Sequence, residues 1–175
     1  MITEWLRKFR KQKRQRITTS YACHRRIIIS SACVRGIQDC LSPNIKKKHE
    51  GVCYLLGKTD GFISLAVSAI RPKAKTTSGS FFVDKPAMAL IVRAAANHSL
   101  QVIGQVHTHP RLAFHSDGDN QGANITYNGY VSIVLPDYGK RLPSFDGAAL
   151  FMYQNRIGFI ELRSSNFIII PEVLP

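Results

Sequence analysis

The chain has 175 residues, 45% of them hydrophobic, which suffices for one domain with a real core. No apolar run approaches the ~20 residues that span a bilayer, and the basic N-terminus lacks the apolar region of a secretory signal. The formal net charge of +13 predicts non-specific attraction to acidic partners. Because no zinc knuckle, RNP sequence or recognition helix accompanies that charge, we expect no specific nucleic-acid binding. We expect a cytoplasmic protein.

A basic arm over residues 1–20 precedes the domain, which we expect over 21–175. Residues 1–16 hold seven Lys and Arg against Glu4 alone, and they carry +6 of the net charge. Trp5, Leu6 and Phe9 fit one apolar face of a short helix. That face would suit an anionic membrane surface, a groove in a partner, or the domain itself. A solvated arm that aids solubility is the plainest alternative.

Hydrophobic periodicity predicts the regular elements. Strands are expected at 25–30, 51–57, 62–70, 102–106, 130–136 and 167–171, with a hairpin over 150–162 that turns at Gln154 and Asn155. A first helix is expected over 32–41, ended by Ser42 and Pro43. A second runs from an Asp84 cap to about His98, with four residues facing inward: Met88, Ile91, Val92 and Ala95. Residues 73–80 are expected to be loop, and a short helix is expected from about Asp119.

This order of elements predicts the fold class. Strands outnumber helices and mix local hairpins with crossovers, so we expect an α/β single domain with a mixed, mostly antiparallel sheet flanked by helices. The four cysteines, Cys23, Cys33, Cys40 and Cys53, show no C-x-x-C spacing. We expect buried thiols that form neither a disulfide framework nor a second metal site.

Two histidines follow the apolar run 102–106 and predict a metal site. Residues two apart on a strand project from the same face, so His107 and His109 can bind one ion. Pro110 lacks the backbone N–H of a strand ladder and should end the strand at the edge of the sheet, where an ion can reach it. Asp119 is the third candidate ligand. Three such ligands leave one position of a zinc tetrahedron for a water whose pKa falls to roughly 7.

Water activation needs a base, and Glu50, just before the second apolar strand, is the candidate. Glu50, the H-T-H-P sequence of residues 107–110, and the S-x-x-D sequence from Ser116 to Asp119 together resemble the JAMM or MPN-plus metalloproteases. The resemblance covers roughly residue 25 to the C-terminus and implies the JAB, cytidine-deaminase-like fold. It implies one zinc per chain on His107, His109 and Asp119, with Glu50 as general base and Ser116 stabilising the oxyanion.

The loop between the two halves of the motif departs from the family. Six residues separate His109 from Ser116, one fewer than is typical. Asp117 is therefore an alternative ligand to Asp119, although only Asp119 keeps the S-x-x-D spacing. His115 is a weaker candidate, because a fourth protein ligand would close the catalytic position. An isolated H-x-H would more often be two hydrogen-bonded histidines, so the interpretation depends on the whole set.

The resemblance also implies a substrate class. Short single-domain members are similar to deubiquitinases and accompany ubiquitin-activating and ubiquitin-conjugating-type enzymes in bacterial antiphage operons. The expected activity is hydrolysis of a peptide or isopeptide bond at the C-terminus of a ubiquitin-like protein. Two alternatives stay open: processing of a sulfur-carrier protein by the same chemistry, and a non-catalytic MPN-type scaffold.

Overall fold

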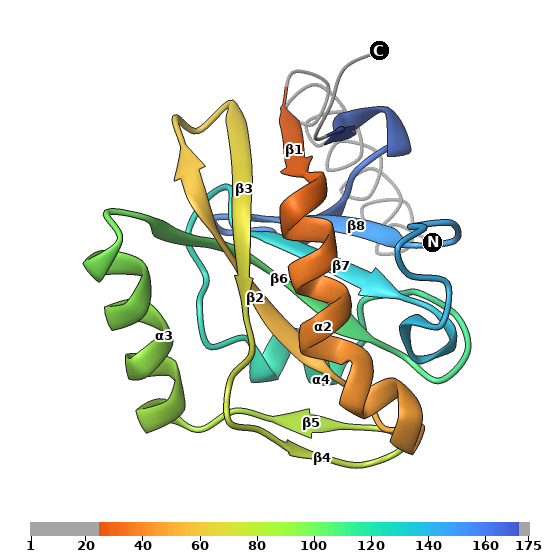
Figure 1. Cartoon of the computed structure of the whole chain (residues 1–175). Helices are drawn as coiled ribbons and strands as arrows, with labels where there is room; N and C mark the ends of the chain where they lie inside the picture. Colours follow the sequence, from red (N-terminus) through yellow and green to blue (C-terminus); the bar gives the residue numbers. More distant parts are fainter. Residues whose placement is uncertain (1–24, 172–175) are drawn as a thin grey trace, which may run out of the picture.

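The computed structural model of the chain describes residues 25–171, so the predicted basic arm and Cys23 lie outside it. One eight-stranded sheet dominates the fold (Figure 1), with the strand order β10, β1, β3, β2, β6, β7, β8, β9. Its strands are β1 (Arg26–Ser30), β2 (Val52–Thr59), β3 (Ile63–Ile70), β6 (Gln101–Thr108), β7 (Val131–Leu135), β8 (Ala149–Gln154), β9 (Gly158–Glu161) and β10 (Phe167–Ile170). The predicted strands are thus confirmed to within a few residues.

The sheet is mixed. Strand β1 pairs in parallel with β3 and β10, and β6 pairs in parallel with β7. The other four pairings, β2 with β3, β2 with β6, β7 with β8 and β8 with β9, are antiparallel. A single-domain α/β fold with a mixed, mostly antiparallel sheet is therefore confirmed.

Two longer helices pack against the sheet, and each covers its own hydrophobic core. Helix α2 (Ser31–Lys47) begins at Ser30, whose side chain accepts a hydrogen bond from the backbone N–H of Cys33. Its buried face packs with alternate residues of β1, β2 and β6. Helix α3 (Lys85–Asn97) begins at the predicted cap Asp84 and packs with the opposite side chains of β2, including Tyr54. Three short helical segments complete the fold: α4 (Asp117–Gly122), η1 (Asp137–Gly139) and η2 (Ser164–Asn166).

The predicted end of the first helix at Ser42 and Pro43 is wrong, because α2 runs through Pro43 to Lys47. An internal proline costs a helix about 3 kcal/mol. Tertiary contacts of the last turn offset that cost: Asn44 is buried, and its side-chain amide donates to the Glu50 carbonyl. Lys48 adopts the left-handed conformation, and its backbone N–H donates to the carbonyls that the helix end leaves open.

Two smaller predictions are also corrected. The segment 73–80, expected as loop, contains β4 (Lys75–Thr76), which forms a two-stranded ribbon with β5 (Phe81–Phe82). Each run has only two residues, which is too few to show a strand period. Val92, expected to face inward, is 50% exposed, whereas Met88, Ile91 and Ala95 are buried as predicted.

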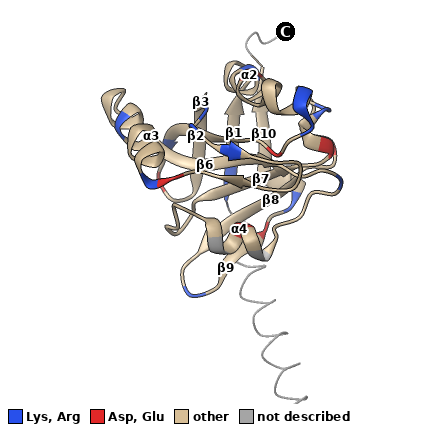
Figure 2. Ribbon diagram, turned by 90° about the horizontal axis from the view of Figure 1, so that it is seen from below, with Lys and Arg blue, Asp and Glu red and all other residues tan. Residues whose placement is uncertain are grey.

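Three consecutive lysines, Lys46 to Lys48, stand at the end of α2, and the three described cysteines lie close together in the core beside this helix. Figure 2 shows Lys and Arg spread over α2, α3 and several loops. Cys33, Cys40 and Cys53 are free, and Cys33 and Cys53 are fully buried. Burial raises the pKa of Cys33 to about 12, so this thiol stays protonated. Among the helices described, none is long and apolar enough to cross a membrane.

Candidate metal centre

The two histidines lie at the end of the buried central strand β6. This strand lies between β2 and β7, and its close approach to β7 requires Gly104, because a Cβ there would come within 2.7 Å of the Val131 carbonyl oxygen. The strand ends at Thr108, and the His109 backbone N–H donates to the Leu135 carbonyl at 2.9 Å. His107 and His109 are 0% and 5% exposed. The histidines were expected at the edge of the sheet. They lie instead at the end of a strand in its interior, between β2 and β7.

The loop after His109 leads into α4, where Ser116 is the N-cap. The Ser116 hydroxyl accepts from the Asp119 backbone N–H at 3.1 Å and donates to Asp119 Oδ2 at 2.7 Å. The Ser116 backbone N–H also donates to Oδ2 at 2.7 Å, which completes a capping box. Contacts between Ser116 and Asp119 alone therefore fix the position of the Asp119 carboxylate, independently of the histidines.

The structure brings together the three predicted ligands. Asp119 Oδ1 lies 3.3 Å from His107 Nε2, and Oδ2 lies 3.3 Å from His109 Nε2. One ligand atom from each of the three residues lies within 4.8 Å of the others. The side chain of Asp117, the alternative ligand, lies outside the part that the structure describes. The spacing therefore suits a single ion held by two imidazoles and a carboxylate.

Hydrogen bonding gives an independent test of this fit. His107 is completely buried, yet neither of its ring nitrogens makes a hydrogen bond to a described residue, and Nε2 has only its 3.3 Å contact with the Asp119 carboxylate. Buried polar nitrogens normally have a partner, because leaving one unpaired costs about 1–3 kcal/mol. A metal ion bound to Nε2 would supply the missing partner, so the donor set fits a metal.

The protonation states also favour a cation. Burial lowers the pKa of His107, so its imidazole is neutral and able to ligate. Burial alone would raise the pKa of Asp119, but contacts with the two histidines and with Ser116 outweigh it and hold that pKa well below its usual range. The His107 imidazole and the Asp119 carboxylate are thus available as ligands near neutral pH.

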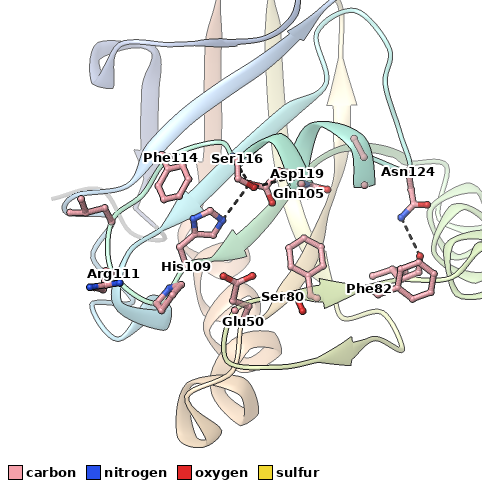
Figure 3. A pocket seen from close by; sticks show the side chains of 18 of the residues that line it. Glu50, Ser80, Phe82, Gln105, His109, Arg111, Phe114, Ser116, Asp119 and Asn124 are labelled. Carbon is pink, nitrogen blue, oxygen red and sulfur yellow. Dashed lines mark hydrogen bonds and ion pairs between the residues drawn. The ribbon is translucent and has the colours of Figure 1, made fainter.

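Glu50, His109 and Asp119 line one pocket, in which Glu50 points towards the other two (Figure 3). Its side chain is not in the metal group, although Glu50 is only 6% exposed. Burial raises its pKa to about 7, the charge of His109 opposes the rise, and the charge of Asp119 adds to it. Glu50 therefore exchanges a proton near neutral pH, as a general base must.

Backbone contacts fix Glu50 relative to the histidines. The Thr108 hydroxyl accepts from the Gly51 backbone N–H at 2.8 Å, and the Thr108 backbone N–H donates to the Gly51 carbonyl at 3.0 Å. The Glu50 backbone N–H donates to the Thr77 carbonyl, and its own carbonyl accepts from Asn44. The roles of Asn44 and Thr77 were not predicted from the sequence. Asn44 was expected to lie beyond the end of the first helix, and Thr77 was expected to lie in a loop.

His115 is not part of the metal group. Its ring stacks on Phe159, with the ring centroids 4.2 Å apart, and also packs against Phe151. Its ring meets the ring of His107 edge-on at a centroid separation of 6.0 Å. Burial, followed by the charge of His107, lowers the pKa of His115 to about 4. His115 therefore lies beside the candidate ligands as a packed, neutral ring.

The candidate centre opens into a pocket of about 820 Å³. Its mouth carries exposed apolar side chains from two segments, Phe82 on β5 and Leu112 and Phe114 on the loop after His109. Arg111 also lines it. A pocket with apolar walls and a few convergent polar groups is typical of a ligand or substrate site.

Comparison with known proteins agrees with the fold and with a metalloprotease-like class. The sequence profile described as prokaryotic homologues of the JAB domain matches residues 44–142. Over 145 residues, 81% of this chain and 90% of the relative, the chain is 26% identical to the "Probable metalloprotease y4jG" of Sinorhizobium fredii. The solution structure of DSY2949 from Desulfitobacterium hafniense matches with a TM-score of 0.61 and 15% identity, covering 84% of this chain and 94% of that one.

The fold and the converging His, His and Asp side chains define a metallopeptidase-like protein. Because the matched segment exceeds half of the chain and contains Glu50, both histidines and Asp119, the chain belongs to the prokaryotic homologues of the JAB domain. The solved structure is too distant in sequence to show more than the fold.

Proposed function

We propose that this protein is a zinc-dependent peptidase or isopeptidase that cleaves at the C-terminus of a ubiquitin-like protein or its conjugate. The observation that carries the proposal is the meeting of His107, His109 and Asp119 beside a pocket that Glu50 also lines. Its setting would be a bacterial antiphage conjugation system in the cytoplasm, beside ubiquitin-activating and ubiquitin-conjugating-type enzymes. This setting is carried by the resemblance of the motif.

Zinc held by His107, His109 and Asp119 would supply a Lewis acid and would lower the pKa of water at the site. Glu50 accepts the proton of the attacking water and delivers it to the leaving amine. Its raised pKa, about 7, suits both halves of that transfer, because a group that titrates near the working pH can accept and release a proton.

Ser116 has two tasks in this proposal. Its hydroxyl positions Asp119, to which it donates at 2.7 Å. It also donates to the oxyanion that develops on the scissile carbonyl, an interaction that exists chiefly in the transition state. The second task requires the hydroxyl hydrogen to turn from Asp119 Oδ2 towards the substrate.

The pocket mouth suits an extended peptide tail. Strand β5 pairs with β4, and no second strand is paired with it in the described part of the chain. A tail could add to that open edge as a further strand, with main-chain hydrogen bonds supplying affinity. Phe82 and Phe114, which line the pocket, would hold its apolar side chains.

Two alternatives predict different behaviour. A processing peptidase for a sulfur-carrier protein would use the same residues and differ in the protein it cleaves. A non-catalytic scaffold would bind its partner without metal, but relatives of that kind lose ligands, whereas His107, His109 and Asp119 converge in this chain.

The decisive experiment compares purified wild-type protein with His107→Ala. Metal content is measured together with cleavage of a ubiquitin-like protein carrying a C-terminal extension, and a sulfur-carrier precursor serves as the parallel substrate. We expect about one zinc per wild-type chain, with both zinc and cleavage lost in the variant. Metal-free wild-type protein that cleaves nothing would overturn the proposal and favour the scaffold. Cleavage of the sulfur-carrier precursor alone would reassign the substrate.

A further inference from the structure

One face of the sheet is apolar and uncovered over β10, β1 and β3, the three strands at one end of the sheet, next to those that α3 covers. On β3, Ser64 and Ala66 point towards α2 and are buried, whereas the alternating side chains point the other way. Ile28 on β1 is in register with Leu65 on β3 and with Ile168 on β10. We call this surface the β10/β1/β3 face, and its members are Ile28, Ile63, Leu65, Val67, Ile168 and Ile170.

These side chains leave a large apolar area in contact with water. Ile28 is half-buried, and the other five are between 36% and 44% exposed. Helix α2 covers the opposite side of β1 and β3, and α3 packs on β2 and β6. These residues form an apolar patch over three neighbouring strands, flanked on β1 by Arg26 and Ser30, which share the side of Ile28. An exposed apolar patch of this kind is typical of an interaction surface.

The chain itself carries an apolar segment of matching size. Ile2, Trp5, Leu6 and Phe9 recur at the spacing of one helical face. The next two positions on that face are Lys13 and Arg16, so the apolar stripe ends after about two turns. Residues 2–9 as a helix would be about 10 Å long. The β10/β1/β3 face measures about 13 Å from Ile63 to Val67 and about 10 Å across its three strands.

Connectivity favours the same chain as the occupant. The described chain begins at Arg25 and enters β1 at once, and β1 is the middle strand of the face. Residues 10–24 reach up to about 50 Å when extended, which is several times the width of the face. A covalent tether of this kind gives an effective concentration in the millimolar range. A helix of this length is marginal in water by itself and needs a surface to pack against.

We infer that residues 2–9 dock as an amphipathic helix on the β10/β1/β3 face, with Trp5 and Phe9 against Leu65 and Ile28 and the Lys and Arg side chains towards solvent. This docking is independent of the metal centre and of the proposed function. It would cover Ile168 and Ile170 on the edge strand β10, which are otherwise 41% and 42% exposed.

Trp5 is the only tryptophan in the sequence, so tryptophan fluorescence, excited selectively over the six tyrosines, reports on this segment alone. In the wild-type protein we expect emission shifted to the blue of free tryptophan, with weak quenching by acrylamide. Both properties should be independent of protein concentration and present without lipid. Leu65→Asp should shift the emission to the red and raise the quenching constant several-fold. Val92→Asp, which places the same charge on an exposed site of α3, should change neither.

A second pair of variants leaves the folded sheet untouched. Phe9→Asp should release Trp5 to water, whereas Lys11→Gln, which lowers the net charge by the same amount on the other side of the predicted helix, should not. Solvent-exposed Trp5 in the wild-type chain, or emission unaffected by Phe9→Asp and Leu65→Asp, would overturn the inference. A blue shift lost on dilution would assign the face to a second copy. A blue shift seen only with anionic vesicles would assign the segment to a lipid surface.

Discussion

The candidate metal centre and the β10/β1/β3 face are opposite exceptions to the usual distribution of residues. In the first, His107, His109 and Glu50 are polar and nearly inaccessible to water; in the second, five large aliphatic side chains are more than a third exposed. Burying polar groups costs free energy unless partners compensate, and exposing apolar area forgoes about 25 cal/mol per Å². Each exception therefore indicates a missing partner, a cation in the first case and an apolar surface in the second.

Removal of the proposed base should have the largest effect. Glu50→Gln keeps the size of the side chain and removes the proton acceptor, so we expect the rate of cleavage to fall by about 10²–10⁴-fold. Zinc content should not change, because Glu50 is not in the metal group. Turnover of the fusion substrate and metal analysis test both points, with Glu161→Gln, an exposed acid on β9, as the matched control. A near-normal rate would show that another residue is the base.

The pH dependence of stability tests the burial of Glu50. Its ordinary pKa is 4.5, and the folded protein raises it to about 7. Between these values the unfolded chain loses a proton that the folded chain keeps, so the free energy of unfolding falls as pH rises. The loss should reach about 3 kcal/mol at most and level off above pH 7. Chemical denaturation of chelator-treated protein measures it.

Glu50→Gln provides the comparison for that titration. His107, whose pKa is lowered by burial, contributes a slope of the opposite sign, so only the difference between wild type and variant isolates Glu50. We expect the wild type to lose stability relative to the variant from pH 4.5 to 7. A constant difference across that range would contradict the raised pKa.

Ser116→Ala separates the two tasks of this serine. The variant loses the N-cap of α4, worth about 1 kcal/mol, and the hydrogen bond to Asp119 Oδ2. Because such outer contacts orient a ligand, we expect zinc affinity to weaken by about 10–100-fold. The zinc affinity, measured by metal titration, and the cleavage rate at saturating zinc should both fall. A normal rate at saturating zinc would show that Ser116 only positions Asp119. Ser116→Thr, which keeps a hydroxyl, should preserve most of the zinc affinity and most of the rate.

Asn44→Ala tests the turn of α2 beyond Pro43. The variant leaves the Glu50 carbonyl without its side-chain donor, and we expect a loss of about 1–3 kcal/mol in the free energy of unfolding. Denaturant unfolding measures this loss. Asn97→Ala, at the exposed end of α3, should change stability by less than about 0.5 kcal/mol. Equal effects of the two variants would show that the Asn44 contact contributes nothing.

The smallest effect is expected on the apolar face. Ile168 is already 41% exposed, so Ile168→Thr should cost less than about 1 kcal/mol of unfolding free energy. Ile29→Thr, on the neighbouring strand but completely buried towards α2, should cost clearly more. Denaturant unfolding of the two variants measures the contrast between the two sides of one sheet. A larger loss at Ile168 would contradict it.

The sequence by itself determined the elements whose signal is local. Apolar runs set the strands, Asp84 set the start of α3, and the spacing of Ser116 and Asp119 set the cap of α4, because each depends on residues within one or two turns. The strand period also places His107 and His109 side by side. The candidate site could be assembled from sequence because its residues fall into three short motifs.

Tertiary structure decided what depends on distant segments. Pro43 stays inside α2 because Asn44 is held by Glu50, and residues 73–80 gain strand structure beside the pocket. The sequence likewise gives no sign that Thr108 ties Gly51 to the metal strand, since a threonine between two histidines is locally ordinary. Val92 lies outside because α3 covers only part of the sheet. Local propensities are worth about 1 kcal/mol or less for most residues and about 3 kcal/mol for an internal proline, so the summed contacts between distant segments outweigh them at these positions.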